Sequence, residues 1–162
     1  MMDASACREH LGKLVEAETG ELATLSELLE REHGLLANGD LPALDAAMRE
    51  RQRCIGRILR VDEERRLLCR NLGQPEDSAA LERLMSWCDP SGALARSWIE
   101  CKDAAARCRV LNDRNGALVS ARLKHVQQRL SALVNAGRQN VTYGRYGAYS
   151  VGTVGRVVTT EA

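Results

Sequence analysis

The sequence predicts an all-α protein: an elongated antiparallel bundle of three long helices and one short connecting helix, followed by a flexible C-terminal tail. Ala, Leu, Glu, Lys and Arg make up close to half of the 162 residues, as is typical of long helices and coiled coils. Aromatic residues are only 3% of the chain and Phe is absent, which argues against the core of a β-sandwich or barrel. Apolar residues also recur every three or four positions over long segments.

The first predicted helix covers residues 4–37. Its apolar stripe consists of Leu11, Val15, Leu22, Leu25, Leu29 and Leu36. Two glutamates, Glu18 and Glu32, interrupt this stripe. The sequence Asn38-Gly39-Asp40 supplies a left-handed glycine to end the helix and a carboxylate to begin the next. Because this connection is so short, we expect the first two helices to form an antiparallel hairpin.

Three further helices follow. The second begins near Leu41 and ends before Gly73, and the third, residues 78–88, serves mainly as a connection. The last helix, residues 94–136, has the most regular heptad pattern. Its seam positions are Leu94, Trp98, Cys101, Ala105, Cys108, Asn112, Asn115, Val119, Arg122, Val126, Leu130 and Leu133. We therefore place a helical bundle domain at residues 4–136.

The composition changes sharply after residue 136. Residues 137–162 are rich in Gly, Val and Thr, hold the three tyrosines of the chain, and contain few charges. Their apolar content is higher than a disordered spacer needs. We expect a mobile Gly/Tyr/Val-rich tail that binds a partner.

The overall charge and the hydropathy pattern exclude several classes of protein. Lys and Arg total 23 against 22 for Asp and Glu, so the chain lacks the positive field of a nucleic-acid binder. No uncharged apolar run approaches the roughly 18 residues of a membrane span, and no apolar signal segment follows Met1. We expect a cytoplasmic protein with no nucleic-acid partner and no membrane insertion.

No motif indicates catalysis. The sequence has no phosphate-binding Gly-rich loop, no His-Glu-x-x-His and no Cys-x-x-Cys, so we predict no catalytic residue and no cofactor. The three histidines lie far apart, His10 and His33 on the first predicted helix and His125 on the last, and a metal site would require them to converge with other ligands. Without a secretory signal, the six cysteines are best interpreted as reduced thiols that pack as small apolar residues. A small metal or redox protein that uses these histidines and cysteines is one alternative class of function.

One polar cluster interrupts the last helix. Asn112 and Asn115 occupy seam positions, and Gly116 follows, although Asn and Gly are both unfavourable in a helix interior. Two interpretations stay open. The asparagines can hydrogen-bond across the bundle and fix its register while Gly116 admits a close helix crossing, or the cluster can form a polar notch where a partner helix binds.

These residues carry a resemblance to a known family. Asn112-x-x-Asn115-Gly116-x-Leu118, followed by Thr142-Tyr143-Gly144-x-x-Gly147, resembles the FlgN family of flagellar type III export chaperones. The resemblance extends over residues 11–147. After Tyr143-Gly144 this chain has Arg145-Tyr146-Gly147, where the family usually has Pro-Asp-Gly or similar.

The resemblance implies a non-enzymatic chaperone. Its partners would be hook-filament junction proteins, also called hook-associated proteins, whose C-terminal helical region it would bind, and the flagellar export gate, to which it would deliver them. A chaperone of this kind needs an apolar helical surface that replaces the client's contacts with other subunits. The client-binding candidates are Asn112, Asn115, Gly116, Leu118, Val119, Val126, Leu130 and Leu133.

The tail supplies the second set of candidates. The resemblance implies an export-gate docking element at Tyr143 and Gly144, and a tyrosine beside glycine is suited to dock in a preformed pocket. A different class of function also fits the heptads, namely a structural coiled coil that self-associates, for example as a homodimer, through the same seam and has no client.

Overall fold

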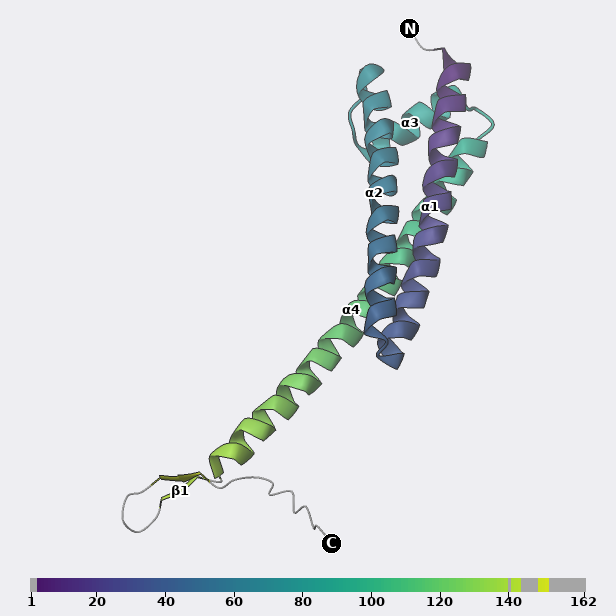
Figure 1. Ribbon diagram of the computed structural model, residues 1–162. Helices are drawn as coiled ribbons and strands as arrows, with labels where there is room; N and C mark the ends of the chain where they lie inside the picture. The colour runs from purple at the N-terminus through teal and green to yellow at the C-terminus, as the bar shows by residue number, and fades with distance from the viewer. Residues whose placement is uncertain (1–2, 140, 144–148, 152–162) are drawn as a thin grey trace. The chain divides into compact units, whose positions relative to one another are not determined.

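The computed structural model describes residues 3–139, 141–143 and 149–151 (Figure 1). Within these residues the helices are α1 (Ala4–Asn38), α2 (Leu41–Asn71), α3 (Ser78–Cys88) and α4 (Ala93–Gln139). Two short strands follow, β1 (Val141–Tyr143) and β2 (Tyr149–Val151). The chain divides into two units, Met1–Leu118 and Val119–Ala162, and each is described by itself.

The helices of the first unit begin and end where the local sequence predicts. The Asp3 side chain accepts a hydrogen bond from the backbone N–H of Ala6, and Asp40 does the same for Ala43 at the start of α2. Gly39, at φ 75°, ends α1 and donates its N–H to the Leu35 carbonyl. These ends produce the expected antiparallel hairpin of α1 and α2 (Figure 1).

The core of the first unit draws on all four helices. Its fully buried members include Leu11, Val15 and Leu29 of α1, together with Met85 of α3 and Cys101 of α4. The helix α3, predicted as a connection, also contributes Ala80, Leu81, Leu84 and Cys88 to the buried residues, so it is part of the core. The side chain of Glu82 on α3 forms an ion pair with Lys102 of α4 at 3.0 Å.

All six cysteines are buried and none forms a disulfide. Desolvation, reinforced by the neighbouring Cys88 thiol, raises the pKa of Cys7 to about 12. Burial also raises the pKa of Cys101 and of Cys108, so these sulfurs stay protonated thiols at neutral pH. The cysteines therefore behave as small apolar core residues, as expected from the sequence.

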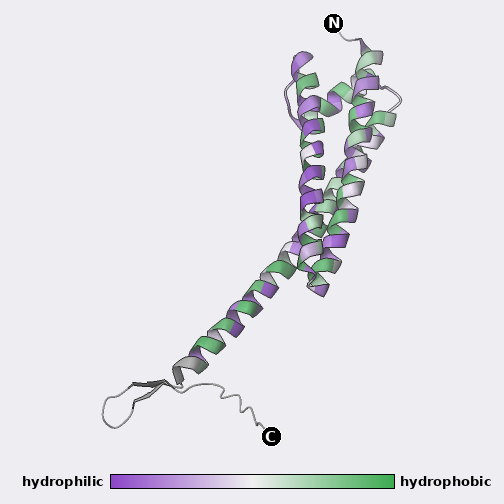
Figure 2. Cartoon of the chain, in the orientation of Figure 1, coloured by the Kyte–Doolittle hydropathy of each residue, from purple (hydrophilic) through white to green (hydrophobic). Residues whose placement is uncertain are grey.

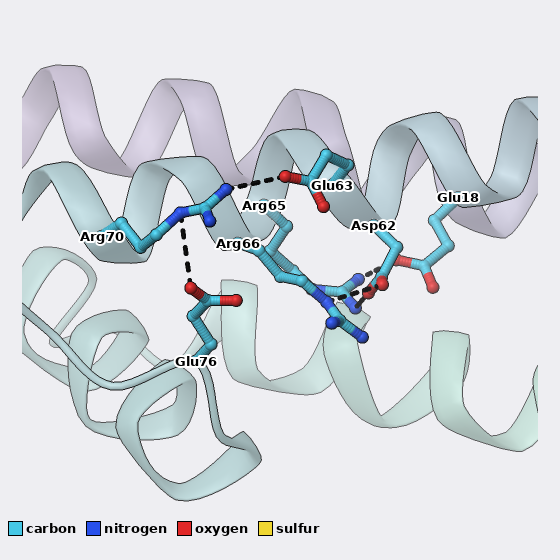
Figure 3. A network of polar contacts seen from close by, with 7 residues as sticks. All are labelled: Glu18, Asp62, Glu63, Arg65, Arg66, Arg70 and Glu76. Carbon is cyan, nitrogen blue, oxygen red and sulfur yellow. Dashed lines mark hydrogen bonds and ion pairs between the residues drawn. The ribbon is translucent and has the colours of Figure 1, made fainter.

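The two glutamates that interrupt the stripe of α1 form ion pairs with arginines of α2. Glu18 pairs with Arg65, which also pairs with Asp62 (Figure 3), and Glu32 pairs with Arg51 at 3.2 Å. Glu18 and Glu32 are two heptads apart, and so are Arg51 and Arg65. Both pairs therefore fit a single antiparallel register of α1 and α2.

The environment of these carboxylates is dry enough to oppose ionisation. Burial raises the pKa of Glu18, although the Arg65 guanidinium acts in the opposite direction. Burial likewise raises the pKa of Glu32 against the attraction of Arg51. The Arg65 guanidinium also lies over the Trp98 ring of α4, 4.6 Å from its centroid, so the pair joins three helices.

Asp89 organises the turn before α4. Its carboxylate accepts hydrogen bonds from the Ser91 hydroxyl at 2.5 Å and from the Leu94 backbone N–H at 2.7 Å. These bonds, with Arg8 nearby, hold the pKa of Asp89 below its usual range. The carboxylate thus caps the first turn of α4.

In the second unit the sequence predicted a helix end near Ala136 and no strands. The helix α4 instead continues to Gln139, and β1 pairs antiparallel with β2 in the register Val141↔Val151, Thr142↔Ser150 and Tyr143↔Tyr149. The remaining tail residues lie outside the described part of the chain. In the part that is described, no helix is both long enough and apolar enough to cross a membrane.

Candidate functional site

Asn115 lies inside the first unit rather than on its surface, with only 4% of the residue exposed. Its amide nitrogen donates a hydrogen bond of 2.8 Å to the Leu29 carbonyl oxygen of α1. Its amide oxygen lies 3.1 Å from Nδ1 of His33, which is therefore the donor in this bond. The buried amide thus joins α4 to α1, as in the first of the two interpretations drawn from the sequence.

The residues beside Asn115 add polar contacts at the same level. Arg114 forms an ion pair with Glu30 of α1 at 2.8 Å, and the hydrogen bond from Arg114 lowers the pKa of Glu30. Arg51 of α2 donates a 3.3 Å hydrogen bond to the exposed Asn112 side chain. Both helices of the hairpin are therefore bonded to α4 within a single turn.

Gly116 does not serve a close helix crossing. The residue is exposed, and a Cβ built at this position would meet no heavy atom within 4 Å. The packing explanation for Gly116 is therefore wrong for the described residues. Leu118, two residues further on, is half-buried.

Beyond Leu118, α4 exposes a continuous apolar stripe. Every residue from Val119 to Ala136 is exposed. The stripe consists of Val119, Leu123, Val126, Leu130 and Leu133. Their exposed fractions range from 48% for Val119 to 70% for Leu133. Their spacing alternates between four and three residues without interruption, and Figure 2 shows apolar residues recurring along this part of the helix.

Leu123 was not predicted, because the seam of the preceding residues continues through Arg122. Counting back one heptad from Leu130 finds Leu123. Val134, 55% exposed beside the stripe, was missed as well. By contrast, the earlier seam residues Leu94, Trp98, Cys101 and Cys108 are at most 8% exposed. Apolar residues at heptad spacing on α4 are thus mostly buried in the first unit and exposed in the second.

An exposed heptad stripe has a specific chemical capacity. Each leucine or valine in it stabilises a complex by about 1.5–3 kcal/mol when a partner buries it fully. The spacing selects a partner helix with matching apolar residues, which would pack as knobs into holes. Within the described residues no group of His, Cys, Asp and Glu is arranged to hold a metal ion. The exposed stripe of α4 is therefore suited to bind a partner helix.

A comparison with protein-family models decides the family. The model described as FlgN protein matches residues 2–150. The chain belongs to the FlgN family. It is therefore a flagellar export chaperone, from a family whose members bind flagellar hook-associated proteins. Searches of curated proteins and of solved structures gave no match.

In this FlgN-family chain, the match includes both candidates for export-gate docking. Tyr143 is the last residue of β1, where its backbone pairs with that of Tyr149. Gly144 lies outside the described residues. The docking role of both residues stays a prediction.

Proposed function

We propose that this FlgN-family chain binds the C-terminal helical region of hook-filament junction proteins along the exposed stripe of α4. The chaperone keeps these clients unassembled and delivers them to the flagellar export gate. The observation that supports this proposal is the uninterrupted heptad of five apolar residues, all at least 48% exposed, on residues 119–133 of α4. A client helix seated on this stripe could not pair with other subunits through the same apolar face.

The candidate residues divide into two groups by their burial. Val119, Val126, Leu130 and Leu133, now joined by Leu123, would contact the client directly. Asn112, Gly116 and Leu118 remain candidates for contact because each is exposed or half-buried. Asn115 is a poor candidate for direct contact, since its amide is already bonded to α1. We assign Asn115 the role of holding α4 against α1.

Delivery to the gate is assigned to Tyr143 and Gly144. A tyrosine combines a large apolar ring with a hydroxyl, so it can anchor a segment in a pocket of a larger protein. The same stripe also gives the self-associating coiled coil a specific basis, because a second copy would present a matching heptad. In that case α4 would pair with α4 and no client would be bound.

Calorimetric titration with the C-terminal helical segment of a hook-associated protein tests the proposal. We expect one-to-one binding with a negative heat-capacity change, because apolar surface is buried. The double variant Leu123→Ser/Leu130→Ser should weaken binding by about 100-fold or more, given the apolar area lost. The matched control Ala121→Ser/Gln128→Ser, which changes exposed residues outside the stripe at the same spacing, should bind like the unaltered chain.

The mass of the complex separates the two functions. A one-to-one complex that disappears in the stripe variant supports the chaperone. Absence of binding at tens of micromolar, together with oligomers of the chain alone that the stripe variant disrupts, would favour the self-associating coiled coil.

A further inference from the structure

A second apolar surface lies in the first unit, between α2 and α4. It is a groove of about 360 Å³ with contributions from three helices. Its apolar lining consists of Leu22, Leu25 and Leu29 of α1, Ile55, Ile58 and Leu59 of α2, and Ala105 and Cys108 of α4. Leu59 is 62% exposed, and Ile55 and Ile58 are half-buried, so the groove opens to solvent.

Two arginines of α2 contact α4, Arg51 in the lining of this groove and Arg65 outside it. Arg65 covers the ring of Trp98, and Arg51 bonds to Asn112 at 3.3 Å. These two contacts are two heptads apart on each helix, which corresponds to about 21 Å of helix length. Between them, α4 presents the small side chains Ala105 and Cys108 to the groove. Arginines thus bridge α2 and α4 at two levels, while the small residues of α4 leave the space between these levels open.

The charged side chains that line the groove are all positive. Its lining includes Arg51, Arg109 and Asn112 but no carboxylate. Arg51 is paired with Glu32, whereas Arg109 forms no ion pair with any carboxylate in the described part of the chain. An apolar groove with an unpaired guanidinium complements a helix that carries bulky apolar residues and a neighbouring carboxylate.

We propose that this groove receives an amphipathic helix of the hook-associated client, with apolar side chains between α2 and α4 and a carboxylate paired with Arg109. This inference rests on the proposed function, since it assumes that the chain binds such a client. The inserted helix would complete a four-helix packing around Leu22, Leu25 and Leu29 and would bury Leu59. The groove is therefore a client contact separate from the stripe of residues 119–133.

Two variants of the full chain test the groove by different means. Ala105→Leu fills the space without removing any hydrogen bond, and Arg109→Glu reverses the unpaired charge. Each should weaken binding of the client's C-terminal helical segment by about tenfold or more, with little change in Tm. The matched controls are Ala106→Leu and Arg107→Glu, which alter neighbouring exposed residues of α4 that do not line the groove. Both controls should bind like the unaltered chain.

The outcomes separate the groove from the proposed function. If the unaltered chain binds the client and both groove variants bind equally well, the groove proposal is overturned and the stripe remains the binding surface. Equal losses in the groove variants and in their controls would also overturn it, because the effect would not be specific to the groove. If the unaltered chain does not bind, the proposed function fails and the groove proposal fails with it. If Ala105→Leu does not fold, the affinity of Arg109→Glu compared with that of its control Arg107→Glu tests the groove proposal.

Discussion

At the scale of the residue, loss of the buried Asn115 amide should lower the stability of the chain. Replacing it by Ala removes two hydrogen bonds and leaves the Leu29 carbonyl and His33 without this partner. The cost is about 1–3 kcal/mol, offset by roughly half a kcal/mol because Ala favours the helix. Chemical denaturation followed by circular dichroism measures this difference in the free energy of unfolding.

Asn112→Ala is the matched comparison on the same helix. Asn112 is exposed and accepts only the 3.3 Å hydrogen bond from Arg51, so its removal should change stability by less than about 0.5 kcal/mol. Equal effects of the two substitutions would contradict the role assigned to Asn115.

Sequence reasoning placed both asparagines on the seam but could not tell which of them was buried. A heptad position indicates that a residue faces a neighbouring helix. It does not indicate whether that helix belongs to the same chain or to a partner. The unfavourable intrinsic propensity of Asn is common to both interpretations, so propensity could not choose between them. The partners of Asn115, Leu29 and His33, are more than 80 residues away in the sequence, and no local pattern indicates them.

At the scale of the element, the buried ion pairs select one register for the hairpin of α1 and α2. The apolar stripes alone would tolerate a shift by one heptad, because apolar residues would again face apolar residues. Such a shift would separate Glu18 from Arg65 and Glu32 from Arg51, and would leave charged groups buried without partners. The cost of an unpaired buried charge is what makes the register specific.

This account predicts an asymmetry between single and double substitutions. Arg51→Met should destabilise the chain by about 3–5 kcal/mol, because Glu32, 3% exposed, loses its counter-ion. The double substitution Arg51→Met/Glu32→Leu should recover most of this loss, since no buried charge remains. Urea denaturation of the two variants measures the difference. A double variant as unstable as the single one would show that the ion pair does more than neutralise charge.

The helix ends were predictable because their signals are local. Asp3, Gly39 and Asp40 each act within four residues of their own position, and the sequence shows them directly. The strands β1 and β2 were not predicted, because three residues each are too few to show the alternation of apolar and polar side chains that identifies a strand. The contribution of α3 to the core was also underestimated, because an eleven-residue segment resembles a connection until its packing is known.

At the scale of the whole molecule, the two units use their apolar residues differently. In the first unit the buried leucines and cysteines pack on one another around α1, and the hydrophobic cluster ends at Cys108, with Leu111 packed against it. In residues 119–136 all described apolar side chains are exposed. Stability therefore resides in the first unit, and the proposed binding of a client helix to the stripe of residues 119–133 uses residues that stability does not require.

The last prediction separates export from stability at this scale. Deleting residues 143–162 removes Tyr143 and Gly144 but no member of the hydrophobic cluster. The melting temperature should therefore change by no more than about 2 °C, and affinity for the client segment should be retained, while export of the hook-associated protein in cells should fall. Differential scanning calorimetry, calorimetric titration and the amount of secreted client measure the three quantities.

Point variants locate the effect within the deleted segment. If Tyr143 docks at the export gate, Tyr143→Ala should reproduce the loss of export while Tyr149→Ala, which changes its partner in the β-ladder, should not. Equal losses in both variants would assign the effect to the pairing of β1 with β2 rather than to a docking side chain. A large fall in melting temperature on deletion would instead show that these residues support the fold, and the loss of export would then follow from instability.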